Sequence, residues 1–475
     1  MNIMHIDSLP SQSIDFSKIE SYNEAIDTTL MIREEYRQFF KNIQNPRLLR
    51  LREKAMSADL TAYLEGFTYN VKPNEYNAVP MDFVPRIISR ENFQTIEDGI
   101  KQRAKTLNMF LKDVYSEEKT IVPEDLIIGS EYFNPDLIGH LPKNNIFIQV
   151  YGADLLYNGE EYYVIEDNLR VPSGVTYPIK IREMFDRYLN VLKKGYKLES
   201  YKPWTFLYHA MQDAAWTKNP FMVLLTDGTA GAAYFEHMYL SKLMEIPIVE
   251  AGDIYVTESG HVVAKIPGEG EIQVDVIYRR VEDLDIFVPG LTKAYIDGKV
   301  ALVNSPGTGI ADDKLVYSYI PKLIQHYLSE EPILEQPKSY NPTIPEELEG
   351  ALQNVDNLVV KERGGYGGIG TVIPRDHPKS KRGELIEKIK KEITENPDNY
   401  LLQETLDFST VITRESFSPL IIRDSYVDLR VFSYYTKEGP HVPPGGLSRF
   451  ARHGRITNNS SGGGVKDTWI VNLNE

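Results

Sequence analysis

A glycine-rich stretch near residue 360 constrains the fold more than any other feature. It reads NLVVKERGGYGGIGTVIP over residues 357–374, and Gly365, Gly367 and Gly370 have the G-x-G-x-x-G spacing. A dinucleotide-binding turn would open a helix directly after these glycines. Here three β-branched residues and a proline follow over 371–374, and such residues disfavour a helix. The pattern therefore predicts a strand, a glycine loop and a second strand.

This glycine hairpin is suited to lie over phosphate groups, because glycine lets backbone N–H groups approach an anion closely. Lys361, on the strand that enters the loop, can reach phosphate oxygens as a point charge. The alternative is a surface hairpin with a solvated lysine, and these residues alone leave both open. A Walker A motif and the H-R-D and D-F-G motifs of protein kinases are absent from the sequence, which excludes both of those phosphate-binding classes.

A second motif is an acidic strand pair, whose Asn-Gly step at 158–159 indicates a hairpin. It carries Asp154, Glu166 and Asn168, and magnesium prefers such oxygen ligands. Glu166 and Asn168 share a strand face, but a two-residue turn would pair Asp154 with Tyr163 on the other face. We therefore predict a three-residue connection or a bulge, which brings Asp154 to the face of Glu166. The alternative is a solvent-exposed acidic strand end.

The composition limits the class of protein. The 475 residues suggest two or three domains, and 42% hydrophobic with 25% charged residues is typical of a soluble globular protein. There is no cysteine, which excludes disulfides, thiolate metal sites and a cysteine nucleophile. A net charge of −16 predicts no nucleic-acid partner. Without a long apolar run or a secretory signal, we expect no membrane partner and a cytoplasmic protein.

Helical and strand-like segments alternate irregularly along the chain. Residues 91–115 have the apolar spacing of a long amphipathic helix, and 312–328 predict another helix, with Asp312 as a candidate N-cap. Strands mix with these helices without strict βαβ order, which favours an α+β or mixed α/β fold with antiparallel sheet. A proline-rich stretch marks a boundary near residue 340. We expect three parts: a peripheral, helical N-terminal extension (1–64), a central part (65–340) and a C-terminal part with the glycine loop (341–475).

The two motifs occur in the order that resembles circularly permuted ATP-grasp proteins, a family related to glutathionylspermidine synthetase-like carboxylate–amine ligases. VIEDNLRVPSG precedes VVKERGGYGGIG here, whereas an ordinary ATP-grasp chain has the reverse order. Other stretches with the same resemblance are MDFVPRIIS, LLTDGTAGAAYFEHMYL, VDVIYRRVEDLD, VNSPGTGIADDKLVYSYIPKL, VDLRVFSYY, GGLSRFAR and SSGGGVKDTWIV. The resemblance implies an ATP-grasp fold with the nucleotide held between sheets.

The resemblance also implies roles for individual residues. Magnesium ligands would be Asp154, Glu166 and Asn168. ATP phosphates would meet two lysines and the loop glycines: Lys314, Lys361, Gly364, Gly365, Gly367, Gly368 and Gly370. Gln403 and Glu404 would meet the adenine. Lys466 is a further candidate for the nucleotide site. Four arginines are candidates for contacting phosphate or substrate and for stabilising a tetrahedral oxyanion: Arg279, Arg280, Arg430 and Arg449.

The implied activity joins a small-molecule or peptide carboxylate to an amine, through an acyl phosphate, with ATP and Mg²⁺ as cofactors and a homo-oligomer as a possible assembly. Two alternatives remain: an ATP-grasp phosphotransferase that forms no amide, and a non-catalytic nucleotide-binding protein. Gly152 stands where glutathionylspermidine synthetases carry an arginine, and Arg170 stands where their motif has an aspartate. Glutathione and spermidine are therefore not carried over as substrates.

Overall fold

The computed structural model describes residues 13–15, 21–43, 48–70, 76–116, 118–365, 370–417, 420–452, 454–457 and 463–473. Within these ranges, the largest sheet has nine strands, which come from both the N-terminal and the C-terminal parts of the chain. Its main strand order is β4-β22-β21-β19-β5-β6, and β1, β18 and β20 also pair with β19. The bounds are β1 Ser13–Asp15, β4 Met81–Ser89, β5 Val150–Tyr157, β6 Tyr162–Asn168, β18 Thr410–Phe417, β19 Leu420–Thr436, β20 Gly439–His441, β21 Leu447–Phe450 and β22 Gly464–Val471.

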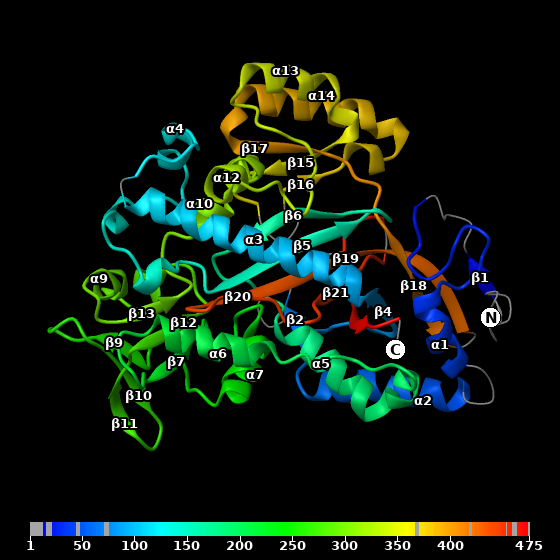
Figure 1. The fold of residues 1–475 in the computed structure, drawn as a ribbon, viewed down its shortest axis with the longest axis horizontal. Coiled ribbons are helices and arrows are strands. Elements are labelled where there is room, and N and C mark those ends of the chain that lie inside the picture. Colours follow the sequence, from blue (N-terminus) through cyan, green and yellow to red (C-terminus); the bar gives the residue numbers. More distant parts are fainter. Residues whose placement is uncertain are drawn as a thin grey trace.

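The pairing of β19 with β5 joins distant parts of the chain. Arg430 on β19 lies directly opposite Asp154 on β5, and Asp428 lies opposite Arg449 on β21. The predicted long helix is confirmed as α3 (Arg90–Tyr115), which begins at an N-cap formed by Ser89 and lies along the sheet (Figure 1). The central sheet thus brings early acidic residues beside late arginines.

A smaller parallel sheet lies beside the central one, with strand order β13-β12-β7-β8. Its strands are β7 Met222–Leu225, β8 Ile248–Val249, β12 Val276–Arg279 and β13 Ala301–Val303, and α6 Pro203–Ala214, α7 Tyr234–Met244 and α9 Leu291–Ile296 accompany it. A three-stranded antiparallel sheet follows from β9 Ile254–Val256, β10 Val262–Ile266 and β11 Gly270–Gln273. Arg279 and Arg280 lie at the carboxyl end of β12. Ligands often bind at this edge of a parallel sheet.

The glycine loop belongs to a third sheet, which we call the lid sheet, with strand order β14-β17-β15-β16. Its elements are β14 Ser339–Tyr340, β15 Leu358–Glu362, β16 Thr371–Val372 and β17 Tyr400–Glu404, with α13 Pro345–Gln353 and α14 Lys379–Glu395 packed on it. Strand β15 runs antiparallel to β16, which confirms the strand, loop and strand pattern. Figure 1 shows the lid sheet and its two helices above the β5–β6 hairpin. The mixed parallel and antiparallel sheets confirm the predicted fold class.

The segment predicted as one helix over 312–328 consists of three: α10 Gly309–Asp312, α11 Lys314–Tyr317 and α12 Ile320–Leu328. The predicted N-cap was wrong by one residue, because Asp313 accepts the hydrogen bond from the Leu315 amide that starts α11. The chain bends at Asp313, which has extended backbone angles. As a result, Lys314 lies at the start of a short helix that faces the lid sheet.

The N-terminal part is integral to the core in its described residues, so the expected peripheral position was wrong. Helix α1 (Glu34–Ile43) buries Tyr36 and Phe39 completely, and the Phe39 ring meets Trp469 of β22 edge-to-face at 6.0 Å. The remaining elements are α2 Leu48–Leu64, β2 Thr68–Asn70, β3 Tyr76–Ala78, α4 Glu124–Ile128, α5 Thr176–Met184 and α8 Leu284–Phe287. Aromatic packing between the two chain ends therefore closes the core.

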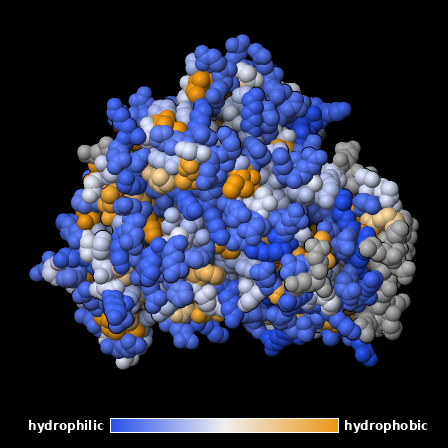
Figure 2. Space-filling view, viewed as in Figure 1, coloured by the Kyte–Doolittle hydropathy of each residue, from blue (hydrophilic) through white to orange (hydrophobic). Residues whose placement is uncertain are grey.

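The face of the molecule in Figure 2 is mainly hydrophilic, and its apolar side chains are scattered rather than gathered. This agrees with the acidic, charge-rich sequence. Among the described residues, no helix combines the length and the apolar character needed to cross a membrane.

Candidate active site

A cleft separates the β5–β6 hairpin from the lid sheet. It holds about 960 Å³ of space that no atom fills, its open mouth included, which is in the size range of small-molecule sites. Its charged and polar lining comes from stretches that lie far apart in the sequence: Asp154, Glu166, Lys314, Lys361, Thr371, Gln403, Glu404, Thr405, Asp428, Arg449, Arg455 and Thr457. The sequence motifs thus meet in one place.

The β5–β6 hairpin contains a β-bulge, one of the two features predicted to bring Asp154 and Glu166 to the same face. Leu155 pairs with Val164, and Asp154 pairs with Glu166, so Ile165 is the extra residue of a β-bulge. The prediction of a bulge is confirmed. Directly paired residues lie on one face of an antiparallel pair, so the bulge places the Asp154 and Glu166 carboxylates together. Asn168 follows two residues later, opposite Gly152.

The two carboxylates have opposite environments. Asp154 receives two hydrogen bonds from Arg430, at 2.6 and 2.7 Å, and one from Arg449 at 2.9 Å. Burial alone would raise the pKa of Asp154, but Arg430 and then Arg449 hold it well below its usual range. Glu166 makes no hydrogen bond or ion pair with the residues that the structure describes. Burial, followed by the nearby Asp154 charge, raises the pKa of Glu166.

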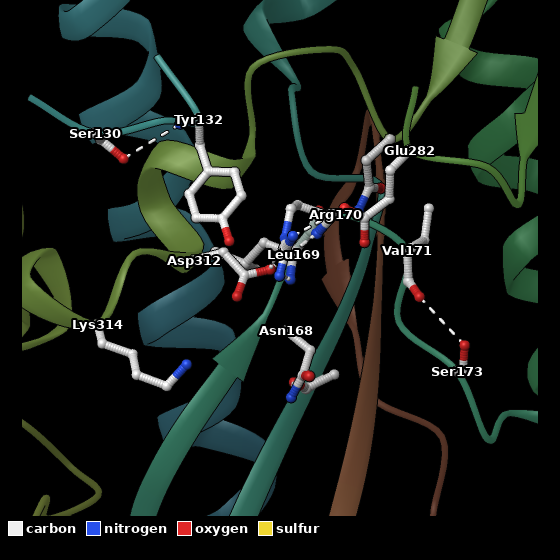
Figure 3. A network of polar contacts seen from close by, with 12 residues as sticks. Ser130, Tyr132, Asn168, Leu169, Arg170, Val171, Ser173, Glu282, Asp312 and Lys314 are labelled. Carbon is white, nitrogen blue, oxygen red and sulfur yellow. Dashed lines mark hydrogen bonds and ion pairs between the residues drawn. The ribbon is translucent and has the colours of Figure 1, made fainter. Parts of the chain in front are cut away.

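Two lysines approach the hairpin from different elements. The Lys361 ammonium donates to the carbonyl of the bulge residue Ile165 at 2.9 Å. Burial lowers the pKa of Lys361 to about 8, although Glu166 acts to raise it. The Lys314 ammonium donates to the Gly365 carbonyl of the glycine loop, and Figure 3 shows its side chain extending toward the end of β6, where Asn168 lies. Both cations therefore face the acidic hairpin.

A polar network holds the end of β6 in place (Figure 3). The Asp312 carboxylate accepts hydrogen bonds from the backbone amides of Leu169 and Arg170, at 2.9 and 3.2 Å. The Arg170 guanidinium binds Asp312 and Glu282 and lies 4.4 Å from the centre of the Tyr132 ring. Arg170, which departs from the motif of the related synthetases, thus anchors the strand that carries Asn168.

The root of the glycine loop is clamped to the core. Arg363 binds the buried Asp313 carboxylate through Nε at 2.8 and 2.9 Å, and Ser130 donates to the same carboxylate at 2.6 Å. Gly364 and Gly365 continue from this clamp. Gly370 closes the loop with φ +75°, and a Cβ there would lie 2.6 Å from a Glu362 carboxylate oxygen, so glycine is required. Gly367 and Gly368 lie outside the described residues.

Part of the cleft lining is apolar, and we call this part the apolar slot: Leu156, Ile165, Pro337, Val359, Ile373, Leu406, Phe408 and Ile456. Gln403 and Glu404 of β17 line the same cleft. The Gln403 amide is 3.4 Å from the Ser339 hydroxyl, and Glu404 accepts from Tyr340 at 3.2 Å. An apolar slot with polar groups at one edge can hold a flat heterocycle.

Seven of the described candidates are not among the residues that line the cleft: Asn168, Gly364, Gly370, Arg279, Arg280, Arg430 and Lys466. The Lys466 ammonium is fully buried and bonds Asp82 and the carbonyls of Val84 and Ile412. Arg279, at the end of β12, donates to the Asn304 carbonyl at 2.7 Å. Arg280 binds Glu236 at 3.1 Å and the Ser173 hydroxyl at 2.6 Å.

Arg280 nonetheless lies next to the cleft. The Ser173 carbonyl accepts a hydrogen bond from Arg430 at 3.1 Å, and Arg430 in turn binds Asp154. Ser173 therefore connects the carboxyl edge of the parallel sheet to the hairpin.

Among the lining residues that sequence reasoning missed are Asp428, Arg455 and Thr457. Asp428 binds Arg449 at 2.6 Å and accepts from the Thr457 hydroxyl at 2.5 Å. Arg455 links the core to the lid region through Asp407 at 3.1 Å and Asp376 at 3.5 Å. The signal for Asp428 was available, because it lies two residues before Arg430 on one strand and shares its face. Arg455 and Thr457 lie in a loop without a pattern that marks them.

The oxygen donors of the hairpin suit a magnesium ion. Over the ranges described above, no group of three or more His, Cys, Asp or Glu side chains has the geometry to hold a metal ion. Asp154, Glu166 and Asn168 supply two carboxylates and one amide, and the Asn168 Nδ2 donates to the Gly152 carbonyl at 3.1 Å, which leaves Oδ1. Magnesium binds through few carboxylates together with water and substrate phosphates, so these residues fit it.

The structure thus combines a cleft lined by the carboxylates of the β5–β6 hairpin with a lid sheet that carries Lys361. The chain belongs to the circularly permuted ATP-grasp proteins of type 2, since the model of that family matches residues 85–451. The family predicted from the motifs is thereby confirmed.

Relatives span nearly the whole chain. An uncharacterised protein of Mycobacterium leprae is 33% identical over 472 residues, which cover 95% of this chain and 82% of that protein. One of Synechocystis is 34% identical, with 89% and 91% coverage. A protein of Frankia casuarinae named putative glutamate–cysteine ligase 2-2 is 33% identical over 94% of this chain, which spans 53% of that protein. The structure of a glutathione synthetase-like effector from Globodera pallida shares the fold, with a TM-score of 0.56, 15% identity, and coverage of 91% of this chain and 99% of that one.

Proposed function

We propose that the protein is an ATP-dependent ligase, which joins a carboxylate to an amine through an acyl phosphate and releases ADP. The observation that carries this is the meeting of four segments in one cleft. Asp154 and Glu166 come from the β5–β6 hairpin, Lys314 and Lys361 from later segments, and Arg449 from near the C-terminus. The ligase name of the Frankia relative agrees with this proposal, as does the family.

The nucleotide would lie with its base in the apolar slot beside Gln403 and its triphosphate under the glycine loop. Lys314 and Lys361 would exchange their present carbonyl partners for phosphate oxygens, which are stronger partners because they are charged. Asp154, Glu166 and Asn168 would hold magnesium, which neutralises charge on the phosphates during transfer. The clamp at Arg363 keeps the loop root in position for closure over the reacting groups.

The acid would enter between the hairpin and the carboxyl edge of the parallel sheet, where Arg280 and Arg430 flank Ser173. Its carboxylate would attack the γ-phosphate and expel ADP, which gives an acyl phosphate. The amine would then attack the acyl carbon, lose a proton and expel inorganic phosphate, which leaves the amide. Arg430 or Arg449 would stabilise the oxyanion of the tetrahedral intermediate. Positioning supplies much of the rate, so no enzyme nucleophile is needed. A closed glycine loop would keep water from the acyl phosphate.

The test is a screen of amino acids, small peptides and amines for ADP release that requires both an acid and an amine. Mass spectrometry of the products should show an amide together with ADP. A phosphorylated acceptor without an amide would instead identify a phosphotransferase. Tight ATP binding without turnover for any pair would identify a non-catalytic nucleotide-binding protein.

A further inference from the structure

Two arginines share the Asp154 carboxylate, but they are held in different ways. Arg430 donates to both Asp154 oxygens, at 2.6 and 2.7 Å. Among the described residues, no other carboxylate pairs with Arg430. Arg449 donates a single hydrogen bond to Asp154, from Nη2 at 2.9 Å. Arg430 therefore depends on Asp154 for its counter-charge.

Arg449 has a second carboxylate partner in Asp428, and this contact is the more extensive one. Asp428 accepts from Arg449 Nε at 3.0 and 3.1 Å and from Nη2 at 2.6 Å. The two residues lie directly opposite each other on β19 and β21, so the sheet fixes their separation. Their side chains are 2% and 7% exposed. A buried, hydrogen-bonded pair of this kind keeps one geometry.

A metal ion at Asp154 would affect the two arginines differently. The ion takes lone pairs of the carboxylate and repels the guanidinium charges nearby. Arg430 would lose its counter-charge and need a new anion as partner. Arg449 would lose one hydrogen bond and keep the three to Asp428. Asp428 and Arg449 both line the cleft, so this pair remains beside the bound ligands.

We propose that Asp428 is a positioning residue, which holds the Arg449 guanidinium and thereby leaves Asp154 free to bind a metal ion. The proposal rests on the proposed function, because it takes Asp154 as a metal ligand. Arg430 is then the arginine that changes its partner and moves to an anionic substrate, while Arg449 stays in the cleft wall. Residues that hold the neighbours of a metal ligand often set the affinity for the metal.

The first test measures binding of Mn²⁺ to the full chain by calorimetry, without nucleotide. In Asp428→Asn the counter-charge of Arg449 is lost, so Arg449 should pair more closely with Asp154 and weaken Mn²⁺ binding about tenfold. Adding Arg449→Met to this variant should restore the wild-type affinity or exceed it, because the competing cation is gone. A general structural defect would instead be made worse by a second substitution in the same buried pair.

The matched control is Asp467→Asn, which changes another buried aspartate of the central sheet. Asp467 pairs with Arg182 at 2.8 Å, its side chain is 2% exposed, and it is not among the residues that line the cleft. Its loss should lower stability and leave the Mn²⁺ affinity unchanged. If this control weakens Mn²⁺ as much as Asp428→Asn does, the effect belongs to any lost ion pair and the proposal is overturned.

A crystal structure of Asp428→Asn without metal separates this proposal from the metal assignment. We expect a second nitrogen of Arg449 to lie within hydrogen-bond distance of Asp154. An Arg449 side chain that keeps its wild-type position would overturn the proposal, as would an Mn²⁺ affinity that Asp428→Asn leaves unchanged. If Arg449 moves as expected and the wild type binds no Mn²⁺, the hold of Asp428 on Arg449 stands and the metal site of the proposed function fails.

Discussion

Asp154 has two competing uses. Its carboxylate is a proposed magnesium ligand, yet Arg430 and Arg449 occupy both of its oxygens. A free metal ion must displace these arginines, whereas a bound triphosphate can draw them away with its own charge. Metal and nucleotide should therefore bind with strong mutual preference.

The variant Arg430→Met tests this competition. Freeing Asp154 from its bidentate partner should tighten binding of Mn²⁺ alone by about tenfold, equivalent to roughly 1.4 kcal/mol. The same variant should weaken a non-hydrolysable ATP analogue, because a cation near the phosphates is lost. Calorimetry measures both. Arg187→Met, an exposed arginine paired with Glu65, is the matched control, and an unchanged or weaker metal affinity in Arg430→Met would contradict the idea.

Glu166→Gln removes the carboxylate that lacks a partner. We expect turnover to fall about a hundredfold or more, because the metal loses a charged ligand. The melting temperature should hold or rise slightly, since a half-buried, unpaired carboxylate becomes a neutral amide. ADP-release assays and thermal denaturation measure the two effects. Full ATP consumption by this variant, with substrates present, would show that the metal assignment is wrong.

The lowered pKa of Lys361 gives nucleotide binding a pH dependence. In the proposed function only the charged ammonium would bind phosphate, and burial lowers the pKa of Lys361 to about 8. Affinity should therefore be full below that pKa and fall as pH rises through it, by about tenfold per unit above it. Titrations between about pH 7.5 and 9.5 avoid the last phosphate ionisation, near 6. Lys361→Arg should flatten the profile, and a wild-type profile equally flat would refute the role of Lys361.

At the scale of elements, the lid sheet depends on its root. Arg363 and Asp313 form an ion pair whose side chains are 13% and 1% exposed. Breaking a buried pair leaves an uncompensated charge. Arg363→Met should therefore lower the free energy of local opening of β15 and β16 by about 2 kcal/mol.

Hydrogen exchange resolved by segment measures this opening. The exchange of α3 should stay unchanged as an internal reference. The control is Arg382→Met. It also removes an arginine from the lid region, but one that pairs with Asp356 at 3.6 Å rather than with Asp313. Equal exchange of β15 in Arg363→Met and the wild type would show that the clamp does not hold the lid.

Elements with local signals were predictable from the sequence. Strand parity predicted either a three-residue connection or a bulge, and the structure has a bulge at Ile165. The β-branched residues after Gly370 predicted a strand. Lys466 was different: the family resemblance suggested it as a site residue, but its partner Asp82 lies 384 residues away in the sequence. Arg279 likewise satisfies carbonyls of a loop that no local pattern pairs with it. The partners of these two side chains are far away in the sequence, so the local spacing of residues could not predict them.

The N-terminal and C-terminal parts of the chain pack against each other in the core. Helix α1 packs Phe39 against Trp469 of β22, and Glu24 forms a buried ion pair with Arg86 of β4 at 2.6 Å. Strand β22 pairs in parallel with β4, so the last strand depends on the first helices. The arginines and carboxylates of the cleft lie on this same sheet, so the site exists only when both ends are in place.

Removing residues 1–64 should therefore abolish folding rather than trim an extension. The single variant Phe39→Ala measures the contact more gently, and truncating such a fully buried phenylalanine costs about 3–5 kcal/mol. Chemical denaturation gives this loss, and Leu64→Ala, at a side chain that is 73% exposed, should stay within about 0.5 kcal/mol. A chain of residues 65–475 that unfolds cooperatively and binds ATP like the full chain would show that the N-terminal helices are dispensable, because the sheet would then be complete without the aromatic contact to Trp469.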